Sequence, residues 1–137
     1  MFKQYSIVDL VKLIQARIRA GLPGISVYDV VPDGTTAPFI YIELTGAAPA
    51  NTKTMYVTQY SIAVHIVTSA KRTNVPAYTY TQRVLEALTE DIAPEAPFSL
   101  LRQECTGVQA TYEEEETGER HSVIGFDFFI TYGFITK

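Results

Sequence analysis

The segment from Met55 to Thr68 alternates between apolar side chains and smaller or polar ones over some fourteen residues. A period of two places successive side chains on opposite faces of an extended strand. One side would carry Tyr56, Tyr60, Ile62, Val64 and Ile66, and the other Gln59, Ser61, Ala63 and His65. Because only one side is strongly apolar, the pattern predicts a long strand in a sheet that buries one face.

A helix is predicted ahead of this strand. Ser6 followed by Asp9 forms a capping-box pattern, which is typical of a helix start. Helical spacing gives the segment one apolar stripe, formed by Ile7, Leu10, Val11, Ile14 and Ile18. Gly21 and Pro23 then end the helix, because both residues are poor continuations of helical backbone.

A second helix is predicted after the strand. Thr73 or Asn74 can cap its start, and Pro76 fits its first turn. Its apolar stripe consists of Ala77, Tyr80, Val84, Leu88 and Ile92, with Ala93–Pro94 at its end. Each helix is apolar on one side only, so both are expected to cover the same face of the sheet.

The last third of the chain predicts a β-hairpin. Its first arm would carry Thr106, Val108, Ala110 and Tyr112, and its second Ile124, Phe126, Phe128, Ile130, Tyr132 and Phe134. Directly opposed residues of an antiparallel pair share a face, and both apolar sets fall on even numbers. The residue numbers of each opposed pair must then have an even sum, which favours a three-residue turn at Glu116–Gly118. Gly118 would supply its left-handed residue.

A further pair of extended segments lies between the first helix and the long strand. Val27 to Pro32 leads into a polar loop, and Pro38 to Ile42 leads out of it. Each proline pushes the residue before it out of the helical region, so the order is strand, loop, strand. We therefore predict one domain over residues 1–137, with an α+β fold: a mainly antiparallel sheet of four or more strands and two helices packed on one face.

Composition and charge exclude several classes of function. The net charge is −4 and the basic residues are scattered, which argues against specific binding of nucleic acid. No apolar run is long enough to span a membrane, and residues 1–5 lack the features of a signal peptide. Cys105, the only cysteine, is expected to be a buried structural thiol.

Catalytic and metal-binding patterns are also missing. A nucleophile with a base, a paired carboxylate site and a phosphate-binding glycine loop do not occur in the sequence. His65 has no second ligand at metal spacing and is expected to face a partner or solvent. A Glu113 or Glu115 opposite His121 would form a charge pair rather than a catalytic dyad. The sequence therefore predicts no enzyme, no cofactor and no metal.

The order of elements resembles the tail-completion or tail-terminator proteins of long-tailed bacteriophages. The matching residues are Val27, Asp29, Val31, Pro32, Pro38, Phe39, Ile40, Ile42 and Ser69. The resemblance implies a structural virion protein that caps the finished tail tube as a ring, with six-fold symmetry, and joins it to the head and neck. Its partners would be copies of itself, the tail-tube protein and a neck or head-completion protein, in a virion assembled in the host cytoplasm. Another neck or head–tail connector protein, or a small non-viral binding module, remains an alternative.

Two segments are candidates for the contacts that such an assembly needs. The first is a long loop, Thr45–Thr54, which is small and uncharged apart from Lys53. The second is the acidic hairpin tip that includes the run from Glu113 to Glu116, which is either a solvated turn or a charged contact. The candidate contact residues are Ala48, Pro49, Asn51, Thr52, Lys53, Thr54, Glu114, Glu115, Glu116, Thr117 and Gly118.

Overall fold

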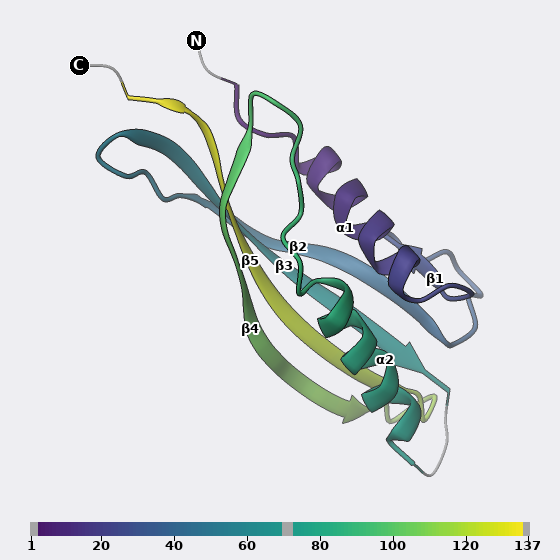
Figure 1. The fold of residues 1–137 in the computed structure, drawn as a ribbon. Coiled ribbons are helices and arrows are strands. Elements are labelled where there is room, and N and C mark those ends of the chain that lie inside the picture. The colour runs from purple at the N-terminus through teal and green to yellow at the C-terminus, as the bar shows by residue number, and fades with distance from the viewer. Residues whose placement is uncertain (1–2, 70–72, 136–137) are drawn as a thin grey trace.

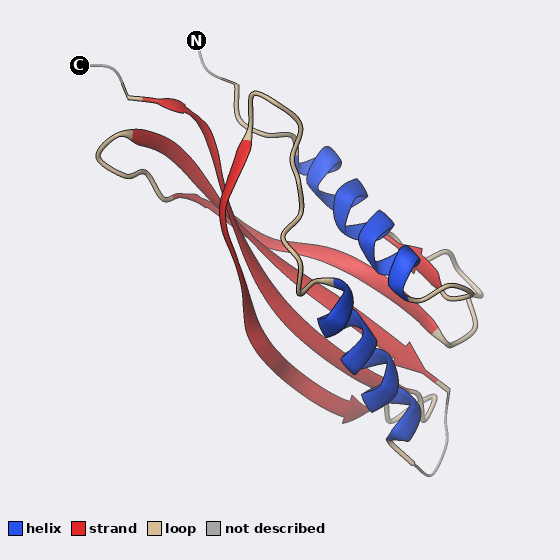
Figure 2. Ribbon diagram, viewed as in Figure 1, coloured by secondary structure: helices blue, strands red, loops and turns tan. Residues whose placement is uncertain are grey.

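The computed structural model describes residues 3–69 and 73–135. Within them lie two helices and one five-stranded sheet, with strand order β1-β2-β3-β5-β4 (Figure 1). The elements are α1 (Ile7–Gly21), β1 (Ser26–Tyr28), β2 (Phe39–Pro49), β3 (Met55–Thr68), α2 (Val75–Ala87), β4 (Ser99–Glu113) and β5 (Arg120–Phe134). Both helices cover one face of the sheet (Figure 2). The predicted α+β class, with a mostly antiparallel sheet, is confirmed.

Helix α1 begins and ends as predicted. The Ser6 hydroxyl accepts a hydrogen bond from the backbone N–H of Asp9 at 3.4 Å, which caps the first turn. Leu10, Ile14 and Ile18 are fully buried against the sheet, whereas Ile7 is 43% exposed and lies outside the buried stripe. Gly21 allows the end of α1 to approach α2, because a Cβ at this position would lie 2.9 Å from the Cβ of Ala87.

Helix α2 is shorter than predicted. It ends at Ala87, six residues before Ala93. The Gln103 side chain replaces the helical hydrogen bonds: it donates to the carbonyl of Leu88 at 2.8 Å and accepts from the N–H of Ile92 at 2.9 Å. Leu88 and Ile92 are nevertheless buried, as the helical stripe predicted.

The core lies between the helices and the even-numbered side chains of the central strands. It includes Tyr60, Ile62, Val64 and Ile66 from β3 and Ile124, Phe126, Phe128 and Ile130 from β5. These are the two apolar sets that alternation predicted to share a face, and the pairing of β3 with β5 places them side by side. Val57 and Val67 are also only 1% exposed, although they lie on the other face.

The first strand is shorter than the prolines suggested. Strand β1 ends at Tyr28, and Asp29 to Pro32 form no strand. Its partner is β2, which runs parallel to it with Val27 beside Ile40. The Asp29 carboxylate explains the early end, because it accepts a hydrogen bond from the N–H of Val30 at 2.8 Å and turns the chain out of the sheet.

The predicted three-residue turn between β4 and β5 is wrong. The β4–β5 register shifts between Leu100 and Arg102, between Cys105 and Gly107, and between Val108 and Ala110. The prediction required the residue numbers of each opposed pair to have an even sum. Each bulge inserts one residue into β4, so after three bulges the sum near the turn is odd. Near the turn the opposed pairs are Tyr112 with His121 and Glu113 with Arg120. The turn is longer than predicted, although Gly118 does adopt a left-handed φ of 72°.

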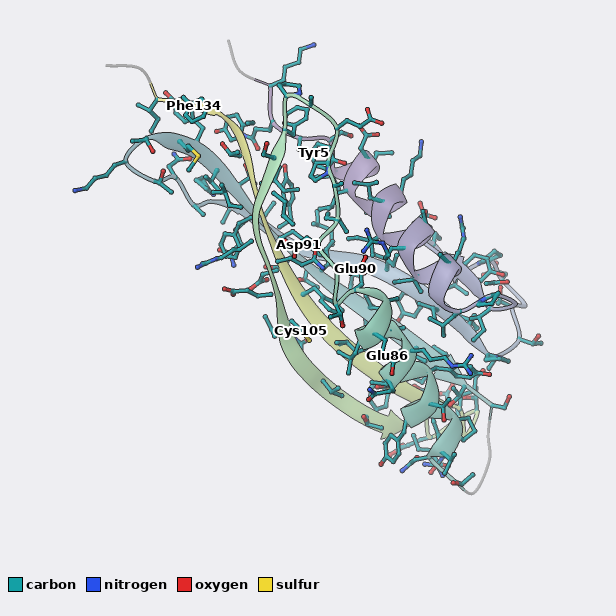
Figure 3. All side chains as sticks on the ribbon, in the orientation of Figure 1. Tyr5, Glu86, Glu90, Asp91, Cys105 and Phe134 are labelled. Carbon is teal, nitrogen blue, oxygen red and sulfur yellow. The ribbon has the colours of Figure 1, made fainter. Side chains whose placement is uncertain are left out.

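Strand β4 is an exposed edge strand. Val108 and Tyr112 are 49% and 47% exposed. They therefore lie outside the core, although their even numbers had predicted that they would share the apolar face of β5. Cys105 is exposed as well, which corrects the expectation of a buried thiol (Figure 3). The reason is position: β4 has a neighbour only on its β5 side, at the margin of the sheet.

Candidate assembly surface

The face of the sheet opposite α1 and α2 carries no helix from the described residues (Figure 2). We call it the helix-free face. Register assigns side chains to it, because directly opposed residues of neighbouring strands share a face. Tyr41 is opposed to His65, and His65 to Val123. His65 thus lies on the helix-free face, on the side of β3 where alternation had placed it.

An aromatic cluster covers one end of the helix-free face. Its members are Tyr28, Phe39, Tyr41, His65, Tyr112 and His121. The rings of Tyr41 and His65 stack with centroids 4.2 Å apart, and those of Tyr112 and His121 with centroids 5.0 Å apart. Val67 lies opposite both Phe39 and His121 on the same face, which accounts for its burial without a helix above it. The face is therefore sheltered by its own side chains rather than fully hydrated.

One ion pair borders this cluster. The Nε2 atom of His65 lies 2.9 Å from a carboxylate oxygen of Glu43, whose side chain is 56% exposed. Burial raises the pKa of the Tyr41 phenol, and the nearby Tyr112 and Glu43 raise that pKa further. Tyr41 is therefore a neutral hydrogen-bonding group at physiological pH, and the exposed charge at this site belongs to Glu43.

A polar groove of about 320 Å³ lies in the middle of the helix-free face. Its lining includes Ser61 and Asp127, which are joined by a 2.8 Å hydrogen bond from the Ser61 hydroxyl to the carboxylate. Thr106 and Gln109, the extra residues of two β4 bulges, lie over Gly125. A Cβ at position 125 would collide with both of these exposed side chains, so they would have to move to admit it.

The predicted Thr45–Thr54 loop is wrong as secondary structure. Strand β2 continues through Pro49, and only residues 50–54 lie between β2 and β3. The tip is held by hydrogen bonds: the N–H of Ala50 donates to the carbonyl of Val57 at 2.8 Å, and the N–H of Val57 donates to the Asn51 side chain at 2.9 Å. We call residues 47–57 the arm. Figure 1 shows that the arm extends beyond the helices.

The exposed Phe134 lies at the same end of the sheet as the arm (Figure 3). It is opposed to Met55 and is 70% exposed. The next residue, Ile135, donates its N–H to the carbonyl of Thr54 at 2.8 Å. The end of β5 therefore braces the arm.

The acidic turn, residues 114–119, lies at the opposite end of the sheet. Strand β3 pairs with β5 from Met55–Phe134 at the arm to Thr68–Arg120 beside this turn. Glu115 and Glu116 are exposed, and the turn closes through a 2.7 Å hydrogen bond from the N–H of Glu114 to the carbonyl of Glu119. Neither Glu113 nor Glu115 lies opposite His121, because the β4 bulges place Tyr112 there and Glu113 opposite Arg120.

The structure thus separates the two predicted contact segments and reveals a third surface. Ala48–Thr54 and Glu114–Gly118 lie at opposite ends of the sheet, as the β3–β5 pairing requires. The sequence did not predict the aromatic cluster, because its members come from five strands and only the pairing of these strands brings them together. The alternation of β3 gave one signal, since it placed His65 on the side away from the core.

Two other kinds of site are missing from the described part of the chain. Residues 3–69 and 73–135 contain no group of three His, Cys, Asp or Glu side chains placed to hold a metal ion. In the same residues, neither helix is long and apolar enough to cross a bilayer.

Comparison with known families assigns the chain to one of them. Residues 1–137 match the phage tail terminator family described as "Putative tail termination protein". The chain belongs to this family. It is therefore a structural protein of a phage-type tail, and the resemblance seen in the sequence is confirmed. No curated protein matches the sequence.

Solved structures show that the fold is shared. A chain described as "Virion of native gene transfer agent (GTA) particle" superposes with a TM-score of 0.75 at 18% sequence identity. The similarity covers 93% of this tail terminator family member and 99% of the other chain. The arrangement of two helices on one sheet face thus persists where most side chains differ.

Proposed function

We propose that the protein caps the finished tail tube as a closed ring of copies and joins the tail to the head through the neck. The observation that carries this proposal is the match of the whole chain to the tail terminator family. Six copies, the number implied by the resemblance, would form the ring. Its site of action would be the virion, after assembly in the host cytoplasm.

The geometry supports a role in assembly rather than in chemistry. A ring subunit needs surfaces for two neighbours and for the components above and below it. The helix-free face and the arm offer area that the chain's own helices leave uncovered, and the arm and the acidic turn extend from opposite ends of the sheet. Exposed aromatic side chains such as Tyr112 and Phe134 are typical of interfaces between chains.

The test is deletion of the gene from the phage-type particle that encodes it. We expect separate heads and tails, with tails of uneven length, because nothing ends tube growth or bridges the two parts. Supplying the protein in trans should restore joined particles, which electron microscopy would count. Purified protein should also form rings at one end of isolated tail tubes.

Two results would contradict the proposal. Joined particles at normal yield without the gene would remove the protein from this step. Tails of uniform length, with the protein bound to heads and not to tubes, would favour the alternative of another neck or head–tail connector protein.

A further inference from the structure

We propose that the arm of one copy packs on the helix-free face of the next copy, with the Lys53 ammonium against the Glu43 carboxylate. This inference rests on the proposed ring and adds to it the surfaces that meet. It names a second copy of this chain as the occupant of the helix-free face.

Carboxylates outnumber basic side chains among the charged residues described on the helix-free face. Glu43 and Asp127 lie on this face, as does the pair formed by Arg102 and Glu104, whose charged atoms are 3.3 Å apart. Arg102 is thus already matched by Glu104, while Asp127 is bonded to the neutral Ser61 and Glu43 to His65. A chain that docks here gains by bringing positive charge to Glu43, because His65 is its partner on one side only and its side chain is still 56% exposed.

The arm carries such a charge. Lys53 is the only charged residue in Thr45–Thr54, and it is exposed at the tip. Within residues 3–69 and 73–135, Lys53 takes part in none of the ion pairs. Its backbone is held in place, because the Thr52 hydroxyl accepts hydrogen bonds from the N–H groups of Thr54 and Met55 at 3.3 and 3.0 Å. The lysine is therefore presented on a braced turn.

Lys53 and Glu43 cannot meet within one copy. Glu43 lies opposite Ala63 along the hairpin, whereas Lys53 lies at its tip. Strands rise about 3.3 Å per residue, so roughly 20 Å separates the two positions, more than a lysine side chain spans. A contact between the tip of one copy and the face of the next is heterologous, the kind of contact that closes into a ring when the rotation fits.

The test is charge reversal measured by sedimentation and by binding to tail tubes. Lys53→Glu and Glu43→Lys should each weaken self-association by roughly tenfold or more, because each places like charges together at the contact. The double variant should restore association. Mixing the two single variants should restore it as well, since every contact in an alternating ring then joins opposite charges.

Matched controls separate this contact from net charge and from folding. Lys12→Glu on α1 and Glu86→Lys on α2 make the same charge changes at exposed positions away from both surfaces, and should associate like the unaltered protein. Thermal melting should show that every variant remains folded, with Glu43→Lys losing only the pair with His65. Single variants that associate normally, or variants whose association neither the double change nor mixing restores, would overturn the arm contact alone. Unaltered protein that forms no ring, free or on tail tubes, would overturn the proposed function together with it.

Discussion

Gly125 sets how closely the bulged edge strand can lie on the sheet. It is buried in β5, opposite Gly107 of β4 and Ala63 of β3. The side chains of Thr106 and Gln109 occupy the space where a Cβ would stand, and the two are linked by a 3.3 Å hydrogen bond. The absence of one side chain in β5 thus allows two side chains of β4 to cover the helix-free face.

We expect Gly125→Ala to destabilise the protein by about 1 kcal/mol, because the added methyl group must displace the exposed side chains of Thr106 and Gln109 from the space they fill. Gly46→Ala is the matched control: no atom lies within 4 Å of the position that its Cβ would take, so its effect should be small. Chemical denaturation would measure both. In a protein that also carries Thr106→Ala and Gln109→Ala, the Gly125→Ala change should cost much less. An equal cost in that background would show that the strain arises elsewhere.

At the scale of elements, Gln103 determines where α2 ends. Its side chain bonds to backbone groups of Leu88, Glu90 and Ile92. Arg17 of α1 holds the same segment from the other side, donating to the carbonyls of Glu90 at 2.9 Å and Asp91 at 3.3 Å. Figure 3 labels Glu90 and Asp91 at this junction. Side chains of β4 and α1 thus supply the bonds that a longer helix would have made for itself.

Gln103→Leu should therefore destabilise the fold by about 1–3 kcal/mol, since it leaves buried backbone groups without partners. Gln82→Leu, on the exposed side of α2, removes only a 3.3 Å bond to Glu86 and should change stability by less than about 0.5 kcal/mol. Urea denaturation would compare the two. Amide exchange at Ile92 should accelerate in the Gln103 variant alone, and slow exchange there would mean that the segment does not depend on this side chain.

The elements that local pattern controls were predictable from the sequence. Alternation located β3 and β5, and the capping pattern at Ser6 located α1. The predictions failed where residues distant in the sequence determine the local structure. The bulges of β4 depend on Gly125 across the sheet, and the end of α2 depends on Gln103.

The candidate site follows the same division. The arm and the acidic turn are continuous segments, so composition was enough to single them out. The aromatic cluster joins residues as far apart as Tyr28 and His121, and only strand order brings them together. The sequence could not single out Glu43 either, because its closeness to His65 depends on the β2–β3 register.

At the scale of the whole molecule, the sheet separates two tips. Strand β3 has 14 residues, which at about 3.3 Å per residue places the arm and the acidic turn roughly 45 Å apart. Electrostatic interactions between exposed groups are screened beyond about 8 Å at physiological ionic strength. The two tips therefore act independently, and in a ring they would meet different neighbours.

We expect Glu114→Gln with Glu116→Gln to leave the melting temperature nearly unchanged, because charges in a solvated turn contribute little to stability. The same double variant should weaken the salt-sensitive joining of the ring to another component of the particle, since at low salt the carboxylates attract a basic surface. Sedimentation should show ring formation at the normal concentration, whereas Lys53→Glu should impair ring formation itself. Normal joining with unaltered salt dependence would mean that the acidic turn is only solvated. Loss of ring formation would instead move the acidic turn into the contact between copies and remove the independence that the length of the sheet predicts.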